Sequence, residues 1–278
     1  MSQKPTSPAI AFRPSARAAM PVAFLPMPPA AAVDAKVEMP AAVDLTGKKK
    51  AWFLVGRGRI GKTTFARWLT ETVGQRGGSA IIAACDPVNR SLRQFLNNVA
   101  EPLSSDPIEV RDWLRDLLQF QMEEGLNSII DLGGGNTSLS ALLAEMPDLH
   151  QVLADGGVEP VALHVVGSDP HDVVPLAVTE AEGFQPTATA IICNEAHGRR
   201  IRFDQVLAQP EVRATLDRGA IQLWMPMLSP DATKQCDANC WRYYDVRTKA
   251  GPFVASAVQT WLRRMGEAMQ PITSWIPG

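Results

Sequence analysis

The stretch LVGRGRIGKTTFARWL, residues 54–69, constrains the fold more than any other part of this sequence. It passes from an apolar run typical of a buried strand, through a glycine-rich loop, into a helical pattern. Gly56, Gly61, Lys62 and Thr63 fit the spacing G-x-x-x-x-G-K-[ST] between that strand and that helix. The sequence therefore predicts a strand, loop and helix unit that can surround phosphate groups.

The glycines of this loop let successive backbone N–H groups turn toward phosphate oxygens, and the following helix adds its positive N-terminal end. We expect the ammonium group of Lys62 to contact the β and γ phosphates and the hydroxyl of Thr63 to bind Mg²⁺. The predicted nucleotide-binding residues of the loop and first helical turn are Gly56, Gly58, Arg59, Ile60, Gly61, Lys62, Thr63 and Thr64. The alternative is a glycine-rich turn capped by a lysine, with no nucleotide.

Beyond this unit, apolar strand patterns alternate with helical patterns along the chain. Further strands are predicted at 79–85, 160–167, 187–194 and 220–226, with another ending at Asp131. Further helices are predicted at 90–99, 106–125, 170–183, 203–219 and 251–270. Because such alternation favours parallel pairing through right-handed crossovers, the predicted fold class is a three-layer α/β fold, with a mostly parallel twisted sheet and helices on both faces. Ligands of such sheets bind at the carboxyl ends of the strands.

Residues 1–47 differ in composition from the rest of the chain. They are rich in proline and alanine, carry few charges and show no sustained helical or strand period. A segment of this kind buries too little apolar surface to offset its ordering entropy, so we predict a disordered N-terminal tail. A partner-binding arm is the alternative. Residues 48–278 are predicted to form one P-loop domain.

Composition narrows the class of protein further. The chain is 46% hydrophobic and 20% charged, with a net charge of −2, which argues against a surface that binds nucleic acid as a whole. A local basic patch, and with it DNA binding, stays open. Four scattered cysteines do not make a disulfide framework, and no apolar run is long enough to span a bilayer, so we expect a cytoplasmic protein.

Two aspartates that follow predicted strands are candidates for phosphate chemistry. Asp131, in SIIDLGGG, is predicted to help bind Mg²⁺, and the glycines after it, Gly134 among them, allow a loop to approach the γ phosphate. Asp86, in AACDPVNRS, is predicted to orient the attacking water and is a further candidate ligand of Mg²⁺. Asp86 and Lys62 are therefore candidate catalytic residues. For each aspartate the alternative is a cap of the following helix.

RGRIGKTT, DPVNRS and DLGGGN occur in the order of the phosphate loop and the two switch segments of the ParA/MinD-like deviant-Walker ATPases. The chain resembles that family over about residues 48–265, and DPVN and CNEAHG are most similar to the nucleotide-binding proteins of plasmid partition and conjugal transfer. The resemblance implies a Mg²⁺-dependent ATPase that forms an ATP-dependent homodimer and turns over slowly until a protein partner stimulates hydrolysis. It also implies a role in positioning plasmids or other DNA, or in conjugal transfer.

Two positions depart from the family pattern. The signature lysine, which reaches the partner's phosphates across the dimer, aligns with Arg57, and the second glycine of the loop aligns with Arg59. Arg57 keeps the charge and is therefore a candidate catalytic residue, with a solvated loop charge as the alternative. A side chain at Arg59 restricts the backbone conformations open to the loop. By the same resemblance, Asn194 would read the adenine edge, unless it is a turn asparagine, and Pro226 would lie in the loop over adenine.

Two other functions stay open at this point. A P-loop kinase for a small molecule would share the loop and Asp131, and the arginines of the segment 197–218 offer a candidate lid. A nucleotide-binding scaffold with little hydrolysis would follow if the altered loop disables turnover. Docking of the C-terminal helix on a membrane is disfavoured, because Arg263 and Arg264 are its only basic residues for attracting anionic lipids.

Overall fold

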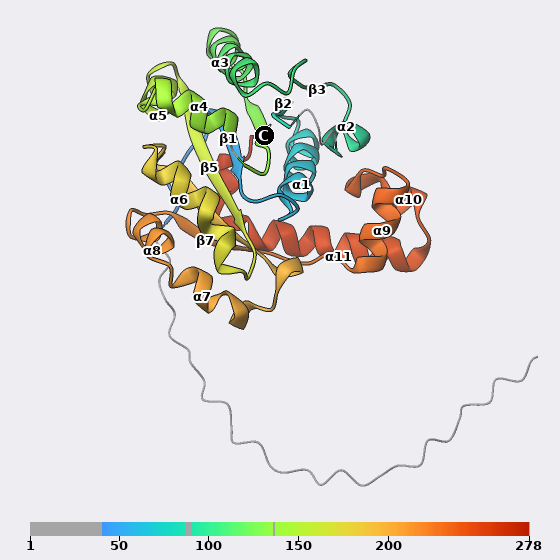
Figure 1. The fold of residues 1–278 in the computed structure, drawn as a ribbon. Coiled ribbons are helices and arrows are strands. Elements are labelled where there is room, and N and C mark those ends of the chain that lie inside the picture. Colours follow the sequence, from blue (N-terminus) through green and yellow to red (C-terminus); the bar gives the residue numbers. More distant parts are fainter. Residues whose placement is uncertain (1–40, 87–90, 136, 278) are drawn as a thin grey trace, which may run out of the picture. The chain divides into compact units, whose positions relative to one another are not determined.

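A seven-stranded sheet forms the centre of the fold (Figure 1). All of its pairings are parallel, in the order β3-β2-β4-β1-β5-β6-β7. The strands are β1 (Lys49–Val55), β2 (Ile81–Ala84), β3 (Val99–Ala100), β4 (Ser128–Asp131), β5 (Val158–Val166), β6 (Ala188–Asn194) and β7 (Ile221–Met225). The structure, a computed structural model, describes residues 41–86, 91–135 and 137–277.

Helices cover both faces of the sheet, which confirms the predicted three-layer α/β class and gives the chain the architecture of a P-loop NTPase. The α-helices are α1 (Lys62–Gln75), α2 (Ser91–Phe95), α3 (Pro107–Glu124), α4 (Thr137–Glu145), α5 (Leu149–Asp155), α6 (Val174–Ala181), α7 (Asp204–Leu207), α8 (Pro210–Asp217), α9 (Pro230–Ala238), α10 (Val246–Lys249) and α11 (Pro252–Ala268). The 3-10 helices are η1 (Pro170–Val173), η2 (Glu195–His197), η3 (Arg200–Phe203), η4 (Tyr243–Asp245) and η5 (Gln270–Trp275).

The apolar run of β1 shows why the central strands read as continuous hydrophobic segments. Trp52 and Leu54 belong to one core cluster, which also holds residues of α1, α11 and η5. Ala51 and Phe53 belong to a second cluster on the opposite face, with residues of α3, α4 and α5. Because side chains alternate along a strand, a strand covered on both faces is apolar at successive positions, as residues 51–55 are.

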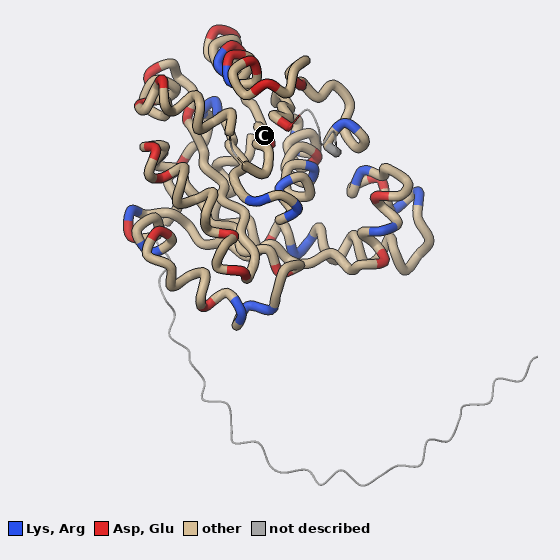
Figure 2. Tube along the Cα trace, in the orientation of Figure 1, with Lys and Arg blue, Asp and Glu red and all other residues tan. Residues whose placement is uncertain are grey.

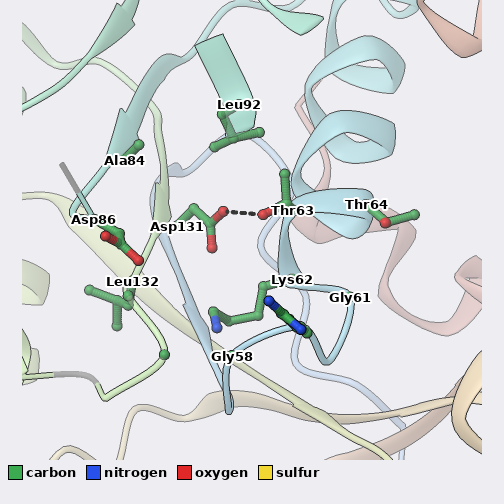
Figure 3. Close-up of a pocket in the computed structure, with 13 residues that line it drawn as sticks. Gly58, Gly61, Lys62, Thr63, Thr64, Ala84, Asp86, Leu92, Asp131 and Leu132 are labelled. Atoms are coloured by element: carbon green, nitrogen blue, oxygen red, sulfur yellow. Dashed lines mark hydrogen bonds between the residues drawn. The ribbon is translucent and has the colours of Figure 1, made fainter. Parts of the chain in front are cut away.

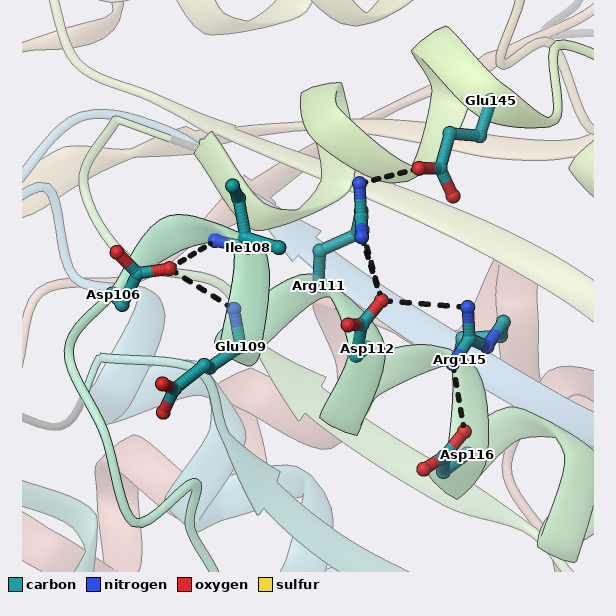
Figure 4. A network of polar contacts seen from close by, with 8 residues as sticks. All are labelled: Asp106, Ile108, Glu109, Arg111, Asp112, Arg115, Asp116 and Glu145. Atoms are coloured by element: carbon teal, nitrogen blue, oxygen red, sulfur yellow. Dashed lines mark hydrogen bonds and ion pairs between the residues drawn. The ribbon is translucent and has the colours of Figure 1, made fainter.

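Local sequence sets the bounds of α3 clearly. The Asp106 carboxylate accepts hydrogen bonds from the first-turn amides, Pro107 takes the first helical position, and Gly125 ends the helix at a φ of 60°. On the outer side of the helix, Arg111 pairs with Asp112 and reaches Glu145 of α4 (Figure 4). Acidic and basic residues are interspersed in the same way over the rest of the described chain (Figure 2).

Some predicted elements differ from those of the structure. The predicted helix 203–219 is divided into α7 and α8, because Pro210 lacks an N–H group and begins a new helix instead of continuing the first. The predicted helix 90–99 ends at Phe95, and Val99 enters the two-residue edge strand β3 beside Ile82. Helices α4, α5, α9 and α10 were not predicted.

The predicted tail overlaps the folded part of the chain. Leu45 is buried, and the Val43 carbonyl accepts a 2.7 Å hydrogen bond from the indole Nε1 of Trp275. The residues just before β1 are therefore packed against η5. Residues 1–40 lie outside the described residues, so the predicted disorder there stays a prediction. Among the described helices, none combines the length and apolar character needed to cross a bilayer.

Candidate phosphate-binding site

A cavity of about 200 Å³ lies at the carboxyl ends of β1, β2 and β4 (Figure 3). It brings together the predicted site residues Gly58, Arg59, Gly61, Lys62, Thr63, Thr64, Asp86, Asp131 and Gly134. Ala84, Leu92, Leu132 and Gly133 also line the cavity and were not among the predicted site residues. Leu132 and Gly133 adjoin predicted residues and Ala84 lies two positions before Asp86, whereas Leu92 is brought to the cavity by the position of α2.

The phosphate loop is held by a buried amide at the end of β6. Asn194 donates from Nδ2 to the Ile60 carbonyl at 2.8 Å and accepts from the Ala196 amide at 3.0 Å. Gly61 is the N-cap residue of α1 and has a φ of 104°, and a Cβ there would lie 2.4 Å from Asn194 Nδ2. A side chain at residue 61 would therefore collide with the amide that fixes the loop.

Lys62 extends back over the phosphate loop. Its Nζ donates to the carbonyl oxygens of Gly56, at 2.7 Å, and Arg57, at 3.0 Å. Burial lowers the pKa of the ammonium group, while the carboxylates of Asp131 and Asp86 act in the opposite direction. An ammonium group has three donors, so one donor stays available for a phosphate oxygen.

Thr63 and Asp131 form the polar pair that the sequence predicts for Mg²⁺. Thr63 Oγ1 donates to Asp131 Oδ2 at 2.9 Å, whereas Asp131 Oδ1 is buried and has no partner among the described residues. Burial raises the pKa of Asp131 to about 6, against the opposing effects of Lys62 and of the Thr63 hydrogen bond. A hydroxyl beside a carboxylate with an unused buried oxygen fits a hard cation such as Mg²⁺.

The loop after β4 packs directly on the phosphate loop. A Cβ at Gly134 would lie 2.8 Å from the Gly58 nitrogen and 2.9 Å from its Cα, so only glycine permits this approach. A Cβ at the neighbouring Gly133 would lie 3.4 Å from the Cβ of Asp86. The loops that follow β2 and β4 therefore meet beside the phosphate loop, where both line the cavity.

The two arginines of the loop have different environments. Arg59 lines the cavity and adopts a φ of 65°, a left-handed conformation that disfavours every residue with a side chain. Arg57 lies outside the cavity, and its guanidinium pairs with the nearly buried Asp172 at 3.1 Å. It lines a neighbouring, largely apolar pocket of about 470 Å³ together with Val174 and Pro175.

Several predicted site residues lie outside the cavity lining. Gly56 directly follows β1 and accepts a hydrogen bond from Lys62 through its carbonyl, and Ile60 is buried in the core below the loop. Pro226 is buried, and its carbonyl accepts a 2.8 Å hydrogen bond from Trp261 of α11. The roles predicted for Asn194 and Pro226 in binding the base stay predictions.

No protein-family model matches the sequence, and no curated protein matches it significantly. Among solved structures, the chain is similar to chloroplast FtsY from Physcomitrella patens, with 13% identity over 65% of this chain and 59% of that chain and a TM-score of 0.42. It is also similar to the signal recognition particle receptor FtsY from Elizabethkingia anophelis, with 17% identity over 68% of this chain and 61% of that chain and a TM-score of 0.41. The chain thus spans about three fifths of these FtsY chains.

A further similar structure is the MinC:MinD cell division protein complex of Aquifex aeolicus. It has 11% identity over 78% of this chain and 96% of that chain, with a TM-score of 0.45. Identities of this size concern the fold alone. The assignment of this chain to the P-loop NTPase architecture follows from its own sheet order and from the loop between β1 and α1.

Proposed function

We propose that this protein binds and hydrolyses a nucleoside triphosphate with Mg²⁺, ATP being the nucleotide that the sequence resemblance implies. The observation that supports this most is the meeting of Lys62, the Thr63–Asp131 pair and the glycine loop after β4 in one cavity. The buried Oδ1 of Asp131, which has no partner within the described ranges, lowers the stability of the fold unless a cation binds there. When bound, Mg²⁺ would neutralise phosphate charge and orient the phosphate oxygens.

In this proposal a water molecule attacks the γ phosphorus in line with the bond to the β-bridging oxygen. That bond breaks, and the products are the nucleoside diphosphate and inorganic phosphate. Lys62 offsets the charge on the β and γ phosphates, and Asp86 orients the water from the end of β2. In this proposal the backbone amides of the loop at Gly134 contact the γ phosphate, which would make that loop sensitive to hydrolysis.

Thermal unfolding with and without Mg²⁺, ATP and GTP tests the binding step. We expect Mg²⁺ and nucleotide together to raise the melting temperature of the wild type and to have no such effect on Lys62→Met. Lys234→Met, which removes an exposed lysine of α9, is the matched control and should respond as the wild type. No stabilisation by either nucleotide with Mg²⁺ would refute the proposal. Comparing ATP with GTP identifies the base preferred.

We further propose an ATP-dependent homodimer in which Arg57 contacts the partner's phosphates. In the monomer this guanidinium pairs with Asp172 of its own chain, so it must leave that carboxylate to act across a dimer. Arg57→Ala should abolish dimers formed with an unhydrolysable ATP analogue, as seen by light scattering after size exclusion. Asp172→Asn releases Arg57 without removing it and should retain the dimers. Loss of dimers in both variants would point to a loop-holding role within one chain.

Phosphate release distinguishes hydrolysis from the other two candidate functions. A kinase would transfer the γ phosphate to an acceptor, and a scaffold would bind nucleotide without releasing phosphate. No arginine of the segment 197–218 lines the cavity in the described part of the chain, so the structure lends the kinase lid no support. Stimulation of phosphate release by a protein partner or by DNA would support the proposed role in plasmid positioning or conjugal transfer.

A further inference from the structure

The segment 230–250, which contains α9, η4 and α10, forms a small lobe beside one end of α11 (Figure 1). We call it the 230–250 lobe. It packs on α11 and on α1, the helix that begins with Lys62. No residue of the lobe lines the phosphate cavity. Coupling between the lobe and the cavity would therefore need residues that contact both the lobe and the helices that contribute to the cavity lining.

Arg67 of α1 makes such contacts, although its side chain is only 3% exposed. One guanidinium nitrogen pairs with Asp237 of α9 at 2.8 Å, and another donates to the Trp241 carbonyl at 3.1 Å. The guanidinium carbon lies 4.3 Å from the ring centre of Tyr243, in η4. The lobe thus holds a buried cation that belongs to the helix of the phosphate loop.

The same guanidinium contacts α2, the helix that contributes Leu92 to the cavity lining. Its central carbon lies 3.4 Å from the ring centre of Phe95, at the end of α2. Leu92, one turn earlier on that helix, is buried and lines the phosphate cavity. Because Leu92 lines the cavity, a nucleotide bound there would act on α2 directly.

We propose that Arg67 is a positioning residue that couples occupancy of the phosphate cavity to the conformation of the 230–250 lobe, through its simultaneous contacts with Phe95 and Asp237. This inference rests on the proposed nucleotide binding. A displacement of α2 must either separate Phe95 from the guanidinium or draw Arg67 along. Because a buried guanidinium is strongly destabilised when it loses its partners, Asp237 and Trp241 are expected to follow it.

Cys240 provides a reporter next to this network. It is the exposed cysteine of the chain, whereas Cys85, Cys193 and Cys236 are buried. Its Sγ lies 3.8 Å from the carbonyl oxygen of Asp237, the residue that pairs with Arg67. The rate at which an aromatic disulfide reagent modifies Cys240 therefore reports on the conformation of the lobe. Cys240→Ser identifies the background from the other three thiols.

The experiment measures this rate with and without Mg²⁺ and an unhydrolysable ATP analogue. Thermal unfolding of the same samples shows independently that the analogue is bound. In the wild type we expect the analogue to change the rate by about fivefold or more, the lower range of typical coupling between sites.

Two variants interrupt the network at different points. Phe95→Leu keeps an apolar side chain on α2 but removes the ring, and Arg67→Met keeps the aliphatic stem but removes the guanidinium. Each should reduce the nucleotide-dependent change to less than about twofold while the thermal shift persists. Arg76→Met is the matched control, because Arg76 lies at the C-terminal end of the same helix and contacts Thr273 instead of the lobe.

Two results would overturn the coupling while the proposed function survives. One is an unchanged Cys240 rate in the wild type although the thermal shift shows bound analogue. The other is a full wild-type response in Phe95→Leu. This substitution removes no charge from the core, so it leaves the pairing of Arg67 with Asp237 in place. Absence of binding in the thermal assay would overturn the proposed function and the coupling together.

Discussion

Replacing Asp131 with asparagine should stabilise the nucleotide-free protein. Asp131 is 8% exposed, and burial raises its pKa from 3.8 to about 6. A carboxyl whose pKa is higher in the fold than in the unfolded chain destabilises the fold at neutral pH. Each unit of the difference corresponds to about 1.4 kcal/mol, so the full effect at pH 7 is about 3 kcal/mol. Asparagine also loses the attraction of Lys62, so we expect a gain of about 1 to 3 kcal/mol.

The pH dependence of the free energy of unfolding shows in which direction Asp131 acts on stability. Between about pH 4 and pH 6 the folded wild type holds a proton on Asp131 that the unfolded chain releases. This group therefore makes the wild type less stable as pH rises through that window, and its contribution is constant above it. Asp131→Asn has no such group and should lack this component. The gain from the substitution should accordingly be small near pH 4 and full at pH 7.

Urea unfolding followed by tryptophan fluorescence, without Mg²⁺ or nucleotide, measures the effect. Asp217→Asn is the control, because it makes the same chemical change at an exposed residue of α8 and should alter stability little. A second arm adds Mg²⁺ and nucleotide, which should stabilise the wild type but not Asp131→Asn. The reasoning fails if Asp131→Asn is less stable than the wild type at pH 7, or if its gain does not depend on pH.

Two further predictions follow from buried groups of β5 and of the phosphate loop. Burial lowers the pKa of His164 to about 3, and Arg218 acts in the same direction. As pH falls below 6.5, the unfolded chain takes up a proton on this histidine that the fold does not, so the fold loses stability. Urea unfolding should show that this loss is about 2 kcal/mol between pH 7.5 and pH 5 and that it is absent from His164→Val. Gly61→Ala should lower stability by about 1 to 3 kcal/mol and remove nucleotide binding, because its Cβ would collide with Asn194. Gly74→Ala, in the last turn of α1 where an added Cβ meets no neighbouring atom, should instead raise stability by up to about 1 kcal/mol in the same measurement, and a loss of equal size in both variants would contradict the steric argument.

The parallel sheet and much of the site could be predicted from the sequence because both depend on local patterns. Buried parallel strands read as continuous apolar runs, as residues 51–55 of β1 show, and turn glycines separate them from helices. The glycines and the lysine of the phosphate loop have a fixed spacing in sequence, and Asp131 is the last residue of the apolar run that forms β4. These features need no knowledge of which distant segments meet.

What could not be predicted depends on distant contacts. Leu92 lines the cavity because α2 packs near α1, and Asn194 holds the phosphate loop across 134 residues of sequence. Helix α9 buries Ala232 and Cys236 but is otherwise mostly polar, so its amphipathic pattern is weak. The cation that joins this helix to α1, Arg67, lies between polar and aromatic partners that no short motif connects.

The hydrogen bond between Val43 and Trp275 joins residues 232 positions apart. During synthesis, the segment before β1 leaves the ribosome early, yet its docking site on η5 does not exist until almost the whole domain has been made. Leu45 must therefore stay exposed to solvent, or to chaperones, while the sheet forms around β1. We therefore expect the segment before β1 to pack on η5 late in folding, well after the phosphate loop has acquired its shape.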